Sequence, residues 1–151
     1  MNVFPKQRAN LITLGVKDLA VAKKFYTQIL GWMPWKEIGD IICFDMNGFI
    51  LCLFPDQALA ADMAQPSDRQ PSKYPGFSLS YNARSEVEVD EIFGRLRARN
   101  VSIIKNPQKA EWGGYSGYFC DPDGHAWEVA YNPFWALDAD GRIDTEEESA
   151  A

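Results

Sequence analysis

The sequence has one histidine and three cysteines among 151 residues, and it contains no long hydrophobic run. No apolar stretch approaches the roughly 20 residues of a membrane-spanning helix, so we expect no membrane partner. Cys43, Cys52 and Cys120 are odd in number and lack the paired spacing of a zinc motif. Together with an amino terminus that lacks a signal-peptide pattern, they indicate a reducing, cytoplasmic location.

Net charge is also small over most of the chain, although 24% of all residues are charged. The formal net charge is −6, but residues 138–151 contain six acids and one arginine and so contribute −5. The remainder carries only −1 and has no basic stripe, which argues against a nucleic-acid partner. We expect residues 138–151 to form an acidic, flexible tail.

Apolar residues are plentiful, and the elements that they predict occur twice in the same order. Hydrophobic residues make up 46% of the chain, enough for one packed domain. A strand at residues 11–16 precedes a helix that Asp18 caps, and three short strands follow. A strand at residues 77–81 and a helix with a Ser85–Glu88 capping box begin the second copy.

The sequence therefore predicts an α+β fold made of two βαβββ modules. We expect one domain over residues 1–137, with modules at about 8–55 and 76–133. Residues 56–75 form the linker, which begins with a short helix over residues 56–64 and continues with a proline-rich stretch.

The stretch DPDGHAWEV, residues 121–129, combines a tight turn with a strand that carries one carboxylate, Glu128. Cys52 is the repeat partner of Glu128, and Leu11 falls opposite Phe77, with a possible shift of one residue. Two such modules side by side would direct these four residues into a shared cavity. Glu128 is interpreted either as a structurally paired carboxylate or as a ligand anchor and general base, since an apolar cavity would raise its pKa.

Two further groups of residues have alternative interpretations. Trp112 and Tyr115 lie among glycines and could stack on a planar ligand, or they could pack in a bulged strand or an interface. His125 follows the turn glycine and is expected to make a local hydrogen bond. Phe134 and Trp135 are expected to dock the carboxyl-terminal segment onto the body or onto a partner subunit.

Three stretches resemble the vicinal oxygen chelate superfamily, which includes glyoxalase I, extradiol dioxygenases and bleomycin-resistance proteins. They are LITLGVKDLAVAKKFYTQILGW, FSLSYN and DPDGHAWEVAYNP, within residues 8–133. The resemblance implies a half-barrel around a cavity, usually in a homodimer. It also implies divalent-metal ligands at positions that match Leu11, Cys52, Phe77 and Glu128.

Only Glu128 among these four positions has a typical ligand type of the family. Leucine and phenylalanine cannot coordinate a metal, and one thiolate with one carboxylate is too small a ligand set for Zn, Fe or Ni. The leading hypothesis is therefore cofactor-free binding of a small, partly apolar molecule by Leu11, Cys52, Phe77, Trp112, Tyr115 and Glu128. The alternatives are a metal-dependent glyoxalase-like lyase, isomerase or dioxygenase with an altered metal site, and a protein whose cavity is filled by its own side chains.

Overall fold

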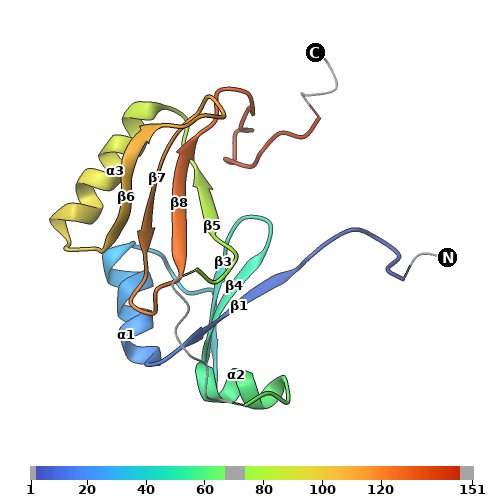
Figure 1. Cartoon of the computed structure of the whole chain (residues 1–151). Coiled ribbons are helices and arrows are strands. Elements are labelled where there is room, and N and C mark those ends of the chain that lie inside the picture. Colours follow the sequence, from blue (N-terminus) through green and yellow to red (C-terminus); the bar gives the residue numbers. More distant parts are fainter. Residues whose placement is uncertain (1–2, 67–73, 147–151) are drawn as a thin grey trace. The chain divides into compact units, whose positions relative to one another are not determined.

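The computed structural model describes residues 3–66 and 74–146, and the chain divides into two compact units, Met1–Arg69 and Gln70–Ala151. Each unit contains one open, four-stranded mixed sheet (Figure 1). The predicted α+β fold with two βαβββ modules is confirmed. Part of the predicted linker, residues 67–73, and the end of the predicted tail, residues 147–151, lie outside the described residues.

The first unit follows the predicted order. Its elements are β1 (Leu11–Val16), α1 (Leu19–Lys24), the π-helical turn η1 (Phe25–Ile29), β2 (Lys36–Ile38), β3 (Ile41–Asp45), β4 (Ile50–Pro55) and α2 (Asp56–Asp62). The sheet order is β1-β4-β3-β2, in which β1 and β4 are parallel and the other pairs are antiparallel. The short helix α2 confirms the helix predicted at the start of the linker.

Local sequence signals explain the helix of the first unit. The Asp18 carboxylate accepts a hydrogen bond from the Val21 N–H at 3.1 Å and so satisfies one free donor of the first turn. The helix widens at its end, where the Leu30 N–H donates to the Phe25 carbonyl five residues earlier. Tyr26 is buried, and its ring stacks on Trp32 with 5.7 Å between centroids.

The second unit repeats this order without the π-helical turn. Its elements are β5 (Leu79–Asn82), α3 (Glu86–Ala98), β6 (Ile103–Lys109), β7 (Tyr115–Cys120) and β8 (Ala126–Tyr131). The sheet order is β5-β8-β7-β6, with β5 and β8 parallel. The predicted strand over residues 77–81 begins two residues later, at Leu79, which is also where pairing with β8 begins.

Alternation along the strands gives the second sheet two different faces. Trp127, Val129 and Phe119 are buried, and α3 runs along the sheet (Figure 1). The intervening residues Glu128 and Tyr118 are only partly buried and belong to the opposite face. This second face carries the polar side chains described below.

Helix α3 begins as the capping box predicts. The Ser85 hydroxyl oxygen accepts from the Glu88 N–H at 3.1 Å, and the Glu88 carboxylate accepts from the Arg84 N–H. The helix approaches β7 at Gly117, where a Cβ atom would lie 2.7 Å from the Phe93 ring and 2.8 Å from the Lys105 carbonyl oxygen. Strand β6 shifts register twice beside β7, between Ile103 and Lys105 and between Lys105 and Gln108.

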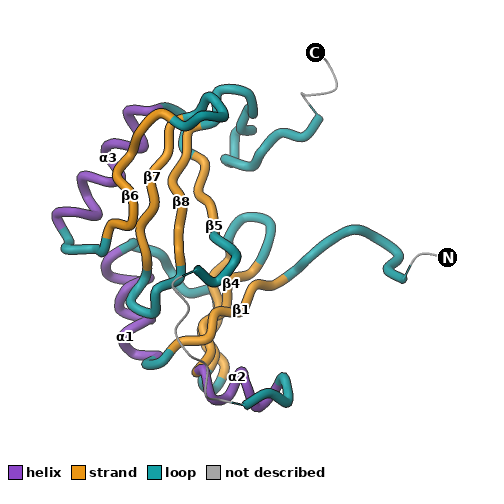
Figure 2. The backbone as a smooth tube through the Cα atoms, in the orientation of Figure 1, coloured by secondary structure: helices purple, strands orange, loops and turns teal. Residues whose placement is uncertain are grey.

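The two hairpins differ by one residue. Four residues, 46–49, separate β3 from β4, and five residues, 121–125, separate β7 from β8. Equivalent positions are therefore 75 residues apart before the turn and 76 apart after it. Residues 132–146, which follow β8, are mostly loop (Figure 2). Within residues 3–66 and 74–146, no helix is long and apolar enough to cross a membrane.

Candidate functional site

A row of four register partners crosses the second sheet. Ser80 on β5 pairs with Glu128 on β8, Glu128 pairs with Tyr118 on β7, and Tyr118 pairs with Lys105 on β6. Directly opposed residues of neighbouring strands project to the same face of a sheet. The row therefore brings a hydroxyl, a carboxylate, a phenol and an amine together although they are spread over 49 residues of sequence.

Glu128 is the centre of this row. One carboxylate oxygen accepts a hydrogen bond from the Ser80 hydroxyl at 2.9 Å, and the other accepts from the Tyr118 hydroxyl at 2.9 Å. Partial burial, the bond to Glu128 and the charge of Glu128 raise the pKa of Tyr118. The sequence left open whether Glu128 has an internal donor, and the structure provides two.

This arrangement favours ligands that donate hydrogen bonds. A carboxylate has about four lone-pair sites, so Glu128 keeps acceptor capacity beyond its two bonds. Tyr118 uses its proton in the bond to Glu128, which leaves its oxygen as a further acceptor. A hydroxyl or amine therefore fits the centre of the row better than an anion does.

The equivalent row of the first sheet has a different centre. Thr13 pairs with Cys52, Cys52 with Cys43, and Cys43 with Lys36. The two cysteine Sγ atoms lie 3.1 Å apart, and only 3% of Cys52 and 8% of Cys43 is exposed. Burial, followed by the contact with Cys43, raises the pKa of Cys52 to about 12.

The predicted site residues at the start of each module lie at its surface. Leu11 is the first residue of β1 and is 57% exposed, while Phe77 precedes β5 and is 47% exposed. Because the pair Thr13–Cys52 matches the pair Ser80–Glu128, the repeat partner of Leu11 is Ser78 rather than Phe77. The predicted equivalence between Cys52 and Glu128 agrees with the strand pairing.

Trp112 and Tyr115 do not join the Glu128 row. The Tyr115 hydroxyl donates to the Asp90 carboxylate on α3 at 2.7 Å, which places Tyr115 on the helix side of the sheet. The Trp112 ring folds over Gly114, where an added Cβ would lie within 2 Å of it. Trp112 keeps about half of its surface exposed in the turn before β7.

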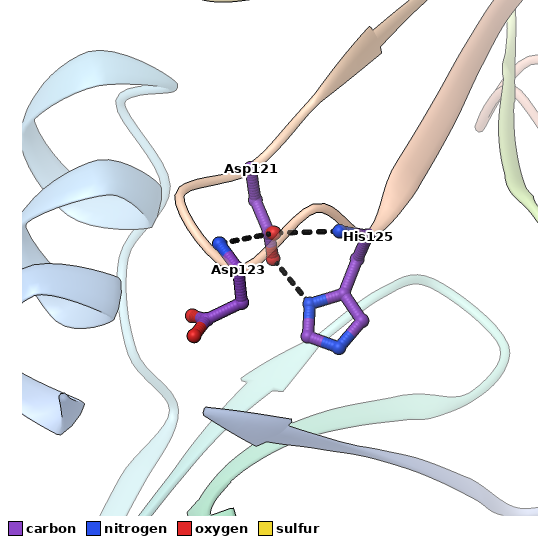
Figure 3. A group of neighbouring side chains, drawn as sticks. All are labelled: Asp121, Asp123 and His125. Carbon is purple, nitrogen blue, oxygen red and sulfur yellow. Dashed lines mark hydrogen bonds and ion pairs between the residues drawn. The ribbon is translucent and has the colours of Figure 1, made fainter. Parts of the chain in front are cut away.

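A compact polar cluster forms the turn between β7 and β8 (Figure 3). Asp121 accepts bonds from the backbone N–H groups of Asp123 and His125 with one oxygen, and its other oxygen lies 2.7 Å from His125 Nδ1. The ligand atoms of these three side chains lie within 4.8 Å of one another. Asp121 and His125 are buried and hold the five-residue turn closed, so the predicted local role of His125 agrees with the structure.

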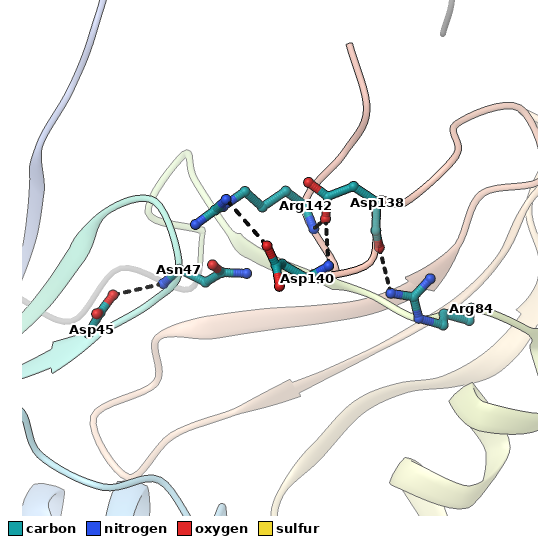
Figure 4. Close-up of polar contacts among 6 residues, drawn as sticks. All are labelled: Asp45, Asn47, Arg84, Asp138, Asp140 and Arg142. Atoms are coloured by element: carbon teal, nitrogen blue, oxygen red, sulfur yellow. Dashed lines mark hydrogen bonds and ion pairs between the residues drawn. The ribbon is translucent and has the colours of Figure 1, made fainter. Parts of the chain in front are cut away.

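The segment after β8 lines a pocket of about 440 Å³ at the carboxyl ends of β5 and β8. Arg84, Tyr131, Phe134, Trp135 and Asp144 are among its lining residues, and none of the Glu128 row lines it. The Arg84 guanidinium donates to the Asp138 carbonyl at 2.7 Å, and the Asp138 carboxylate accepts from the N–H groups of Asp140 and Arg142 (Figure 4). The Arg84 bond joins the segment to the chain after β5, and the two Asp138 bonds close a turn within the segment.

Sequence reasoning missed Tyr118, Ser80 and the pairing of Cys43 with Cys52. The lengths of the two hairpin turns are the signal that could have revealed these pairs. A turn centred on Asn47 and Gly48 makes Cys43 and Cys52 opposite partners, and a five-residue turn centred on Asp123 does the same for Tyr118 and Glu128. A second turn that ended at Gly124 would give a different register, and Tyr118 and Glu128 would not be opposite each other.

A family profile described as Glyoxalase/Bleomycin resistance protein/Dioxygenase superfamily matches residues 8–129. The metallothiol transferase FosB of Lysinibacillus sphaericus is 28% identical over 122 residues, which are 81% of this chain and 80% of that protein. The glutathione transferase FosA of Serratia marcescens is 31% identical over 126 residues, 82% of this chain and 79% of that protein.

Solved structures show the same likeness. A glyoxalase-related enzyme from Fulvimarina pelagi superposes with a TM-score of 0.80 at 36% identity, over 92% of this chain and 98% of that chain. A lactoylglutathione lyase from Agrobacterium tumefaciens superposes with a TM-score of 0.67 at 26% identity, over 89% and 100% of the two chains.

Proposed function

This chain belongs to the Glyoxalase/Bleomycin resistance protein/Dioxygenase superfamily, and we propose that it binds a small, partly apolar molecule without a divalent metal. Glu128 accepts a hydrogen bond from a hydroxyl or amine of that molecule. The observation that supports this most is the carboxylate held between two hydroxyl donors, Ser80 and Tyr118, on the sheet face opposite α3.

The donor set around Glu128 does not fit a Zn, Fe or Ni centre. Such centres take three or four ligands from histidine, cysteine and carboxylates. The two side chains bonded to Glu128 are neutral hydroxyls, and the other three positions that the resemblance assigns to metal ligands hold Leu11, Cys52 and Phe77. The row therefore lacks the ligands that such a metal requires.

The surroundings of Glu128 suit a ligand that is partly apolar. Ala126 and Ala130 flank Glu128 two residues away on β8, so their methyl groups belong to the same face. Ala130 is only 3% exposed, so the ligand contacts the partly exposed Ala126 methyl group, and this contact removes apolar ligand surface from water, at about 25 cal/mol per Å². The hydrogen bond to Glu128 then fixes the orientation of the ligand.

The alternative is a metal-dependent enzyme of the superfamily, such as a thiol transferase, a lyase, an isomerase or a dioxygenase. The names of the two similar proteins, metallothiol transferase and glutathione transferase, favour it. The clustered Asp121, Asp123 and His125 are the residues that such a metal would use. A cation there would compete with two backbone N–H donors and the His125 ring, which already bond to Asp121.

Native mass spectrometry of protein purified without chelators tests the proposal. We expect no stoichiometric metal and a bound organic molecule that is released on denaturation. About one Zn, Ni, Fe or Mn per chain after dialysis would overturn the metal-free proposal. The same spectrum reports whether the chain forms the homodimer that exposed Phe134 and Trp135 lead us to expect.

A matched pair of variants then assigns the site. Glu128→Gln removes the charge and keeps the shape, and we expect it to weaken binding of the released molecule about tenfold, which corresponds to about 1.4 kcal/mol. Glu111→Gln makes the same change at an exposed position of the same unit and should leave affinity unchanged. Equal affinities of Glu128→Gln and Glu111→Gln for the molecule would show that Glu128 does not bind it.

A further inference from the structure

We propose that Cys43 and Cys52 are an oxidation site that a small hydroperoxide converts into a reversible cross-strand disulfide. The two Sγ atoms lie 3.1 Å apart, so bond formation requires them to approach by only about 1 Å. They belong to adjacent strands of one unit, and their approach requires no rearrangement of the fold. The inference does not depend on the ligand proposed for Glu128.

Backbone bonding shows which kind of antiparallel pair these cysteines form. The Cys43 carbonyl accepts a hydrogen bond from the Trp35 N–H at 2.8 Å, so its polar backbone groups point toward β2 and away from β4. Cys43 and Cys52 are therefore a non-hydrogen-bonded pair, in which the Cα atoms lie about 4.5 Å apart and the side chains are closest. This separation falls within the range of known disulfides, about 4.4–6.8 Å.

The same geometry indicates that the disulfide is reversible. A Cα separation of about 4.5 Å lies at the short end of the disulfide range, where departures from preferred geometry make the bond easier to reduce. Strained disulfides have higher reduction potentials than ordinary structural ones. A dithiol reductant should therefore restore both thiols without denaturing the protein.

The reaction balances with hydrogen peroxide as the oxidant. One cysteine, as its thiolate, attacks a peroxide oxygen, the O–O bond breaks, and a sulfenic acid and one water form after proton transfer. The second thiol attacks the sulfenic sulfur, the S–O bond breaks, and the second water leaves. Two thiols thus lose two electrons and two hydrogens, and one peroxide becomes two waters.

Burial makes this oxidation slow. The pair is nearly inaccessible, and the raised pKa of Cys52 keeps its reactive thiolate scarce at neutral pH. An exposed thiol of ordinary pKa should react well before the pair does. The site therefore responds to sustained oxidation rather than to a brief exposure.

Intact-mass spectrometry of the full chain after prolonged hydrogen peroxide treatment tests the proposal. We expect a linked Cys43–Cys52 peptide on digestion, with a mass two hydrogens below the sum of the two separate peptides. Dithiothreitol should break this link and restore both thiols, whereas any oxygen added to the exposed Met33 and Met63 should remain. Oxygen additions without hydrogen loss, or a link that includes Cys120, would overturn the proposal.

Three variants control the experiment. Cys120→Ala should form the disulfide as the natural chain does and lose both remaining thiols together. Cys43→Ala and Cys52→Ala should never show the two-hydrogen loss within one chain. If Cys43→Ala and Cys52→Ala do not fold, Cys120→Ala alone still tests the proposal. Two free thiols in Cys120→Ala after the peroxide treatment would contradict it.

Discussion

The two sheets have matching rows with different centres. Both rows have a hydroxyl residue at one end, Thr13 or Ser80, and a lysine at the other, Lys36 or Lys105. The first row has a buried pair of thiols at its centre, and the second has a partly exposed carboxylate bonded to a phenol. Position within the repeat therefore sets where a side chain lies, while residue type and burial set its chemistry.

The largest expected effect comes from placing the acid of the second row into the first. Cys52→Glu puts a carboxylate at a buried position beside Cys43, without the two hydroxyls that support Glu128. An uncompensated buried charge destabilises a protein by about 3–5 kcal/mol, so we expect a loss of that order in the free energy of unfolding. Urea unfolding monitored by tryptophan fluorescence measures it.

The reciprocal exchange is the control. Glu128→Cys removes a partly exposed carboxylate with its two hydrogen bonds and should lower the free energy of unfolding by about 1–2 kcal/mol, less than Cys52→Glu does. Similar losses in Cys52→Glu and Glu128→Cys would mean that the two rows do not differ in their tolerance of charge.

A double-mutant cycle measures the coupling free energy between Tyr118 and Glu128, at the centre of the second row. The hydrogen bond between Tyr118 and Glu128 is to a charged group but is partly exposed, so we expect a coupling free energy of about 1 kcal/mol. Tyr118→Phe, Glu128→Ala and the double variant supply the cycle by urea unfolding. Additive losses would show that the bond contributes nothing to stability.

A smaller effect is expected at the hydroxyl ends of the rows. Ser80→Ala removes one exposed donor to Glu128 and should lower stability by about 0.5–1 kcal/mol. Thr13→Val is the matched change in the first row, where the neighbouring group is a thiol rather than a carboxylate. Thermal melts should therefore show a lower midpoint for Ser80→Ala than for Thr13→Val, and the reverse order would contradict the comparison.

The smallest effect is a pH dependence that belongs to the second row. The pKa of Tyr118 is raised above its ordinary value of 10.0, so its stabilising contribution is present below pH 10 and is lost as the pH rises through the folded-state pKa. The stability difference between the natural chain and Tyr118→Phe should stay constant from pH 8 to 10 and then shrink. Urea unfolding at each pH measures this difference, and a difference that grew above pH 10 would be inconsistent with a raised pKa.

Much of the fold could be predicted because its signals are local. Asp18 and the Ser85–Glu88 box begin the two helices, and Gly31, with its φ of 79°, follows the first. The doubled order of elements follows from hydrophobic periodicity. The start of β5 was misplaced by two residues, because Phe77 continues the apolar pattern although pairing with β8 begins only at Leu79.

The candidate site could be predicted only in part because it depends on register between strands. Glu128 stands out as a carboxylate on an apolar strand, but its partners Ser80 and Tyr118 lie 48 and 10 residues away. Finding them requires the length of the second turn. Asp121 extends that turn to five residues by accepting the His125 N–H, a contact that no single-residue propensity encodes.

The close approach of Gly117 to α3 limits how far this protein could be redesigned as a symmetric repeat. The first module has Ile42 at the equivalent strand position, opposite Leu53 as Gly117 is opposite Val129. An isoleucine cannot replace Gly117 while the Phe93 ring and the β6 backbone remain in place. A designer who copied the first-module strand with Ile42 into the second unit would have to remodel β6 as well, and the register shifts there show the path that β6 takes beside Gly117.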